Sequence, residues 1–252
     1  MPSATLAFVL PALLAAAAVG MSKGGVPMIG ILAVPILSVA MPPIAAAGLL
    51  LPVYVVSDIF GVWAYRREFS ARNLLILGPS ALLGIGIGWA TASLISEPMV
   101  MMLVGAIGLA FCLDRWFGRR PVAARPADVP RGVFWGALTG FTSFVSHAGA
   151  PPYQMYVLPQ RLPKLVFAGT STILFAGINA AKLVPYWALG QLNPANLQAA
   201  ALLAPVAVVG TFAGVWLTRI MPERSFYRLI VAALFLLSLQ LLFSGAREAG
   251  LF

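Results

Sequence analysis

Apolar runs of about 20 residues constrain this chain most, because an α-helix crosses the hydrocarbon core of a bilayer with a run of that length. Residues 43–64 and 73–95 form two such runs. Of the 252 residues, 61% are hydrophobic and 9% are charged, whereas about a quarter of the residues in a soluble domain are charged. The sequence therefore predicts an all-α polytopic membrane protein.

The apolar segments form two groups, separated by a Pro- and Arg-rich linker at residues 114–131. We predict a first repeat at residues 1–113 and a second at residues 132–252. Each repeat would hold an interrupted or re-entrant helix pair and three transmembrane helices, about 8–10 segments in all. The segments are residues 5–21, 25–40, 43–64, 73–95, 98–113, 132–146, 149–159, 165–187, 196–220 and 226–243.

The two halves also match in detail. MSKGGVP at residues 21–27 reappears as VSHAGAP at residues 145–151, which sets Lys23 opposite His147, the one histidine of the chain. A collinear series of such matches indicates an internal duplication. Further matches at similar separations are Asp58 with Asn179, Tyr65 with Tyr186, and Gly84 and Gly88 with Gly210 and Gly214.

Loop charge predicts the orientation. Lys and Arg gather after residue 65, in the linker, and around residues 161–164 and 219–228, but not near residues 96 and 191. Short basic loops stay in the cytoplasm, so we predict a multi-pass protein of the cytoplasmic (inner) membrane with a cytoplasmic linker and both termini outside. The loop after Tyr65 is basic and the matching loop after Tyr186 is uncharged, which predicts that the two repeats are inverted.

The interrupted pairs predict a binding site. Discontinuous helices that meet near the midplane form the sites of secondary transporters, and helix N-termini attract anions. Lys23 would add a full charge to such a site and His147 a titratable one. The predicted substrate-binding residues are Ser22, Lys23, Gly24, Gly25, Ser143, Ser146, His147 and Gly149, with Asp58 and Asn179 as coupling or charge partners.

Structural alternatives stay open for these charges. Lys23 could snorkel to an interface, and His147 could satisfy a backbone carbonyl. Asp58 could pair with Lys23, carry a proton, or lie near the cytoplasmic end with Arg66. Lys182 stands near the outer end of its span, where its side chain could reach the interface.

Glycine spacing predicts how the spans pack. Gly84-x-x-x-Gly88 and Gly210-x-x-x-Gly214 are close-packing motifs of membrane helices. We expect them to join spans within one protomer, and a homo-oligomer stays open.

Composition argues against other classes of protein. Cys112 is the single cysteine, which excludes an internal disulfide and a cysteine metal cluster, and we expect no metal or cofactor. The net charge of +9 lies in loops between apolar segments, where it sets orientation instead of binding nucleic acid. Ser143 and His147 could form a catalytic pair, but no third group is evident to orient the imidazole, so we do not expect an enzyme.

The chain resembles the sulfite exporter TauE/SafE family over nearly its whole length. The motifs are GMSKGGVP in the first repeat, SHAGAPP in the second, and the Ala-Gly starts AAAGLLL and FAGTSTI of the following spans. The family usually has a run of glycines in both turns, whereas the second turn here has His147 and only Gly149. The resemblance implies transport of small sulfur-containing anions, such as sulfite, sulfonates or sulfoacetate, across the cytoplasmic membrane.

Export is the favoured direction of transport. An interior-negative potential favours outward movement of an anion by about 2.3 kcal/mol per charge per 100 mV, so a monoanion can leave without coupling. The predicted partners are therefore a small sulfur oxyanion or sulfonate and the lipid bilayer. A proton- or sodium-coupled uptake permease, or a non-transporting membrane scaffold that docks through the linker, remains the alternative.

Overall fold

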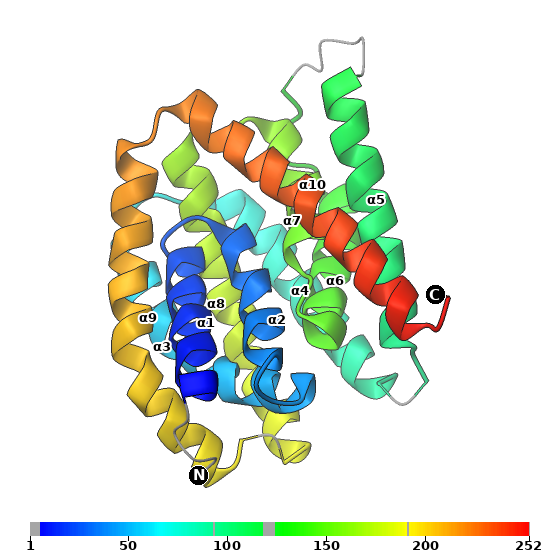
Figure 1. Cartoon of the computed structure of the whole chain (residues 1–252). Helices are drawn as coiled ribbons and strands as arrows, with labels where there is room; N and C mark the ends of the chain where they lie inside the picture. Colours follow the sequence, from blue (N-terminus) through cyan, green and yellow to red (C-terminus); the bar gives the residue numbers. More distant parts are fainter. Residues whose placement is uncertain (1–5, 93, 118–123, 191, 252) are drawn as a thin grey trace. The chain divides into compact units, whose positions relative to one another are not determined.

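The computed structural model describes residues 6–92, 94–117, 124–190 and 192–251, which form helices and no strands (Figure 1). The first half contains α1 (Leu6–Lys23), η1 (Pro27–Leu32), α2 (Ala33–Ser38), α3 (Pro43–Tyr65), α4 (Ala71–Ala90) and α5 (Glu97–Phe117). The second half contains α6 (Val129–Ser146), α7 (Ala150–Val157), η2 (Leu158–Gln160), α8 (Lys164–Ala188), α9 (Pro194–Ile220) and α10 (Glu223–Glu248). Here η marks a 3₁₀-helix.

Each predicted apolar segment corresponds to a helical element. Among the described residues, six helices are long and apolar enough to cross a membrane, namely α3, α4, α5, α8, α9 and α10. The elements of the interrupted pairs, α1 with η1–α2 and α6 with α7–η2, are not among these six. The prediction of an all-α polytopic membrane protein is confirmed.

Local sequence explains where the long helices begin. Ser70 caps α4 by accepting a hydrogen bond from the Asn73 backbone N–H, and Asn193 caps α9 in the same way through Asn196. Asp128 caps α6 through the Arg131 backbone N–H at 3.0 Å. Each cap satisfies an N–H that the first helical turn leaves without a partner.

The chain forms two compact units. Unit 1 comprises Met1–Phe69 and Leu165–Met221, and unit 2 comprises Ser70–Lys164 and Pro222–Phe252. Unit 1 therefore holds α1 to α3 with α8 and α9, and unit 2 holds α4 to α7 with α10. Because each unit takes helices from both predicted repeats, compactness divides the chain differently from the duplication, and the repeat boundaries stay a prediction.

Glycines allow the closest helix contact in each unit. In unit 1, α1 runs beside α9 (Figure 1), and a Cβ built on Gly20 would lie 1.9 Å from the Ala207 carbonyl oxygen. In unit 2, α4 packs on α6, and a Cβ on Gly84 would lie 1.9 Å from the Ala137 carbonyl oxygen. A side chain has no room at either point. The prediction that the paired glycines join spans within one protomer is confirmed, since Gly210 and Gly214 also face α1.

The described part of the linker is bound to unit 2. The Arg125 backbone N–H donates to the Pro159 carbonyl at 3.0 Å, and the Arg72 side chain donates to the Ala127 carbonyl at 3.1 Å. Residues 124–131 are thus a fixed segment, whereas the linker residues Arg119 and Arg120 lie outside the described part of the chain.

Candidate functional site

Lys23 and Asp58 form a buried ion pair in unit 1. Lys23 is the last residue of α1, and its Nζ lies 2.8 Å from Oδ1 of Asp58 on α3. Each side chain is 6% exposed. Asp58 stands seven residues before the end of α3, which corresponds to about 10 Å along the helix. Lys23 therefore lies in the interior instead of snorkelling to an interface. Asp58 pairs with Lys23, whereas the Arg66 side chain donates a hydrogen bond to the Trp63 carbonyl.

Asn179 holds the other oxygen of the carboxylate. Its Nδ2 donates a 2.7 Å hydrogen bond to Oδ2 of Asp58, and it is 6% exposed on α8. The carboxylate is thus bound on one oxygen by a cation and on the other by an amide. Such partners are what a buried charge requires, because an unpaired one costs several kcal/mol, on the order of 3–5.

Two aromatic rings flank the Lys23 ammonium. Nζ lies 5.0 Å from the centroid of the Tyr54 ring and 5.9 Å from that of Phe175. Rings at this distance attract a cation through their faces. The Tyr54 hydroxyl donates to the Gly30 carbonyl, which fixes the ring between α3 and η1. The ammonium thus has two aromatic rings and the Asp58 carboxylate as neighbours.

Lys182 is the third charge of this region. It is 1% exposed and belongs to the largest fully buried side chains, and it interacts electrostatically with Lys23 and Asp58. The prediction that its side chain reaches the interface is wrong. The reason is helical spacing: Lys182 lies three residues after Asn179 and thus on the same face of α8. We call Lys23, Asp58 and Lys182 the Lys–Asp–Lys cluster, whose formal charge is +1.

The turn after Lys23 is held by hydroxyl groups. The Gly24 carbonyl accepts hydrogen bonds from Tyr65 at 2.6 Å and Thr218 at 3.1 Å, and the Lys23 carbonyl accepts one from Thr172 at 3.1 Å. Gly25 has a φ of 109°, a conformation that glycine adopts without strain. The turn thus positions the lysine rigidly at the end of α1.

Two details of this first turn differ from the prediction. Pro27 begins the next element as expected, but that element is a six-residue 3₁₀-helix and not an α-helix with a strong N-terminal dipole. The Ser22 hydroxyl donates to the Val19 carbonyl at 2.6 Å, so its proton is used within α1. The positive charge at this turn therefore comes from Lys23.

The second turn lies in unit 2 and has its own geometry. His147 follows the end of α6 with a φ of 53°, in the left-handed region, which a non-glycine residue seldom adopts. The Ala148 N–H donates to the Thr142 carbonyl at 3.2 Å, and Ser146 donates to the same carbonyl at 3.2 Å. Gly149 precedes α7, whose first turn contains Pro151.

The structure thus distributes the predicted site residues over both units. Unit 1 contains Ser22, Lys23, Gly24, Gly25, Asp58 and Asn179, and unit 2 contains Ser143, Ser146, His147 and Gly149. Sequence reasoning missed Tyr54, Phe175 and Thr172 and underrated Lys182. Tyr54 and Phe175 are separated by the same 121 positions as Asp58 and Asn179, so the duplication held a signal for them.

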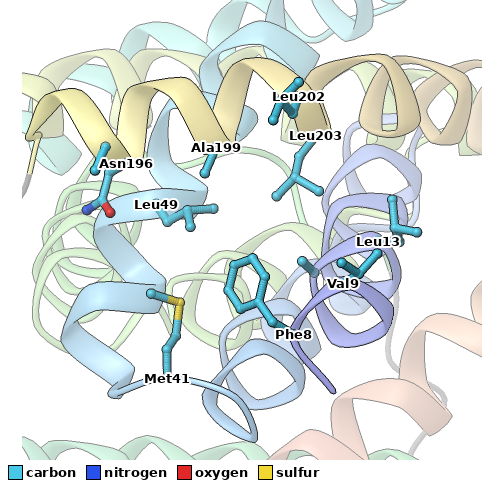
Figure 2. Close-up of a pocket in the computed structure, with 11 residues that line it drawn as sticks. Phe8, Val9, Leu13, Met41, Leu49, Asn196, Ala199, Leu202 and Leu203 are labelled. Atoms are coloured by element: carbon cyan, nitrogen blue, oxygen red, sulfur yellow. The ribbon is translucent and has the colours of Figure 1, made fainter. Parts of the chain in front are cut away.

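A separate pocket in unit 1 is apolar (Figure 2). Its volume is about 300 Å³, and α1, α3, α9 and Met41 line it. Asn196 is the polar residue among the described residues that line it, and none of them is charged. Leu13, the last α1 residue of the lining, lies ten residues before Lys23, about 15 Å along the helix. This pocket does not suit a small anion.

Comparison with known proteins agrees with the prediction of a membrane protein of a transporter family. Residues 12–241 match the family model described as Sulfite exporter TauE/SafE. Neither the curated proteins nor the solved structures include a match. The family transports sulfur-containing anions across membranes, and a match over nearly the whole chain shows membership. The chain, a multi-pass membrane protein, therefore belongs to the sulfite exporter TauE/SafE family.

Proposed function

We propose that this protein is a secondary transporter that exports sulfite or organosulfonate-type anions, and that the Lys–Asp–Lys cluster is part of its binding site. The observation that carries the proposal is the burial of two lysines with a single aspartate between helices of one unit. Tyr54 and Phe175 would shield the bound anion from water.

The charge of the cluster supports an anionic substrate. A lysine near the centre of a membrane helix costs about 2.5–3.5 kcal/mol on insertion scales, and Asp58 offsets the charge of one lysine. A bound monoanion would bring the formal charge to zero, whereas a cation would be repelled. Sulfonates and hydrogen sulfite carry one negative charge and meet this requirement.

The position of the cluster supports entry from the cytoplasm. Asp58 lies about 10 Å from the end of α3. The basic residues Arg66 and Arg67, which we predict to be cytoplasmic, directly follow that end. The membrane potential would then drive the anion outward without a coupled ion.

We propose a role in anion binding for the second turn as well. Its sequence match with the first turn and the left-handed backbone of His147 support a role, since strained residues cluster at functional sites. His147 would add a titratable charge to anion binding, and Ser143 and Ser146 belong to the same turn. Coupled uptake is the second candidate function, because Asp58 is a buried acid.

Flux measurements in proteoliposomes test the proposal. We expect sulfite efflux from the compartment made negative by a potassium diffusion potential, with little response to a pH gradient of equal size. The variant Lys23→Gln should abolish this flux. Lys164→Gln is the matched control, because Lys164 begins α8 outside the cluster. Flux that follows the pH gradient and ignores the potential would contradict uncoupled export and favour the permease.

A further inference from the structure

We infer that Asp58 is an internal competitor of the transported anion, which takes the place of the Asp58 carboxylate on the Lys23 ammonium. The inference rests on the proposed function of the Lys–Asp–Lys cluster and adds how the site binds its substrate.

The Lys23 ammonium has a carboxylate and two aromatic rings as neighbours. Tyr54 and Phe175 flank the ammonium, and the carboxylate of Asp58 stands 2.8 Å away. We expect an anion that contacts Nζ directly to take the position of this carboxylate. An anion that stays outside would face the repulsion of Asp58 as well as the attraction of Lys23.

Lys23 and Asn179 hold different oxygens of the Asp58 carboxylate. Nζ of Lys23 lies 2.8 Å from Oδ1, a distance typical of a charge-assisted contact between an ammonium and a carboxylate. The hydrogen bond from Asn179 goes to Oδ2. Exchange at Oδ1 therefore breaks a charge attraction, which the incoming anion restores, and leaves the bond to Asn179 in place.

Lys182 provides the displaced carboxylate with a second cation. It follows Asn179 by one turn on the same face of α8, and it already interacts electrostatically with Asp58. With a monoanion on Lys23 and Asp58 turned toward Lys182, the formal charge is zero and no proton is needed. The titratable groups that face Asp58 are Lys23 from α1, Lys182 from α8 and Tyr54 from α3 itself.

Two buried hydroxyl groups supply further donors. Ser57 Oγ on α3 and Ser171 Oγ on α8 are buried and have no hydrogen-bond partner among the described residues. Ser171 precedes Phe175 and Asn179 by four and eight residues, so these three share one face of α8. Hydroxyl donors without partners are costly in an apolar interior and are available to the oxygens of a bound anion.

The variant Asp58→Asn tests the competition. It removes the negative charge, keeps the size of the side chain and can still bond to Asn179. Calorimetric titration in detergent with methanesulfonate, which does not titrate near neutral pH, should show binding at least about tenfold tighter than to the native protein, a change of one decade in Kd. Lys23→Gln should not bind. Folded Asp58→Asn protein with unchanged or weaker binding would overturn the inference.

A measurement on the native protein covers the case in which Asp58→Asn does not fold. Titration of methanesulfonate in buffers of different ionisation enthalpy reports the protons taken up on binding, and we expect none. Uptake of one proton per anion would indicate that Asp58 is protonated when the anion binds. That result would overturn the exchange of Asp58 from Lys23 to Lys182. If the native protein binds neither sulfite nor methanesulfonate, the proposed function fails. If the native protein binds methanesulfonate and Asp58→Asn binds it no more tightly, the inferred competition fails and the proposed function stands.

Discussion

Asn179 donates a 2.7 Å hydrogen bond to Asp58, although the two residues stand 121 positions apart at matching places in the two halves of the chain. Residues related by a two-fold axis touch one another only beside that axis. The predicted inverted repeats would place such a pair beside a pseudo-two-fold axis, and they stay a prediction. The first half has the acid Asp58 where the second has the amide Asn179, so this pair carries a single negative charge.

Both buried lysines should contribute to anion affinity. Both lysines lie in the Lys–Asp–Lys cluster, where each would attract an anion. We expect Lys23→Gln to abolish methanesulfonate binding and Lys182→Gln to weaken it by about tenfold or more, with Lys164→Gln unchanged, as measured by calorimetric titration. An equal loss in all three variants would indicate a general effect of net charge.

Removal of Lys23 should destabilise the fold by leaving Asp58 without its cation. Breaking a buried pair from one side costs about 3–5 kcal/mol, so Lys23→Met should lower the unfolding temperature in detergent markedly. The double variant Lys23→Met with Asp58→Asn should recover part of the loss, because the carboxylate charge that lost its partner is removed. A double variant no more stable than Lys23→Met would contradict the energetic coupling of the pair.

Glycine substitutions on α4 should separate packing from helix propensity. A Cβ at Gly84 would lie 1.9 Å from the backbone oxygen of Ala137, so Gly84→Ala must push α4 from α6 and should cost about 1–3 kcal/mol. Gly78 and Gly86 stand on the same helix with nothing within 4 Å of an added Cβ. Gly78→Ala and Gly86→Ala should be neutral or stabilising by about 0.5–1 kcal/mol. Thermal unfolding of the three variants measures the difference, and equal effects would be evidence against the close contact.

His147 should make anion binding pH-dependent if it faces the anion. A protonated imidazole attracts an anion, and anion binding in turn raises the pKa of the imidazole. The added affinity is then present below the ordinary histidine pKa of about 6.5 and lost as the pH rises through the raised value. Titration of methanesulfonate between pH 5 and pH 8, a range of about three units around that value, checks this. His147→Asn is the control, since asparagine tolerates the left-handed backbone. Identical profiles would remove His147 from the site.

The sequence by itself determined the helices. Apolar runs long enough to cross a bilayer predict α3, α4, α5, α8, α9 and α10, and caps such as Ser70 and Asn193 mark where α4 and α9 begin. These features are local, because a helix satisfies its backbone within the segment and its ends within a turn. The family resemblance is also a matter of sequence, since short motifs carry it.

Tertiary structure decided which charges share one interior. The sequence left three roles open for Asp58 and allowed the Lys182 side chain to reach the interface, whereas the fold buries both residues in the unit that contains Lys23. It also joined α1 to α9 through Gly20 and Ala207, between the first and the last helix of unit 1. Such contacts depend on how helices more than a hundred residues apart in sequence pack, and the cost of a buried charge depends on the partners that this packing provides.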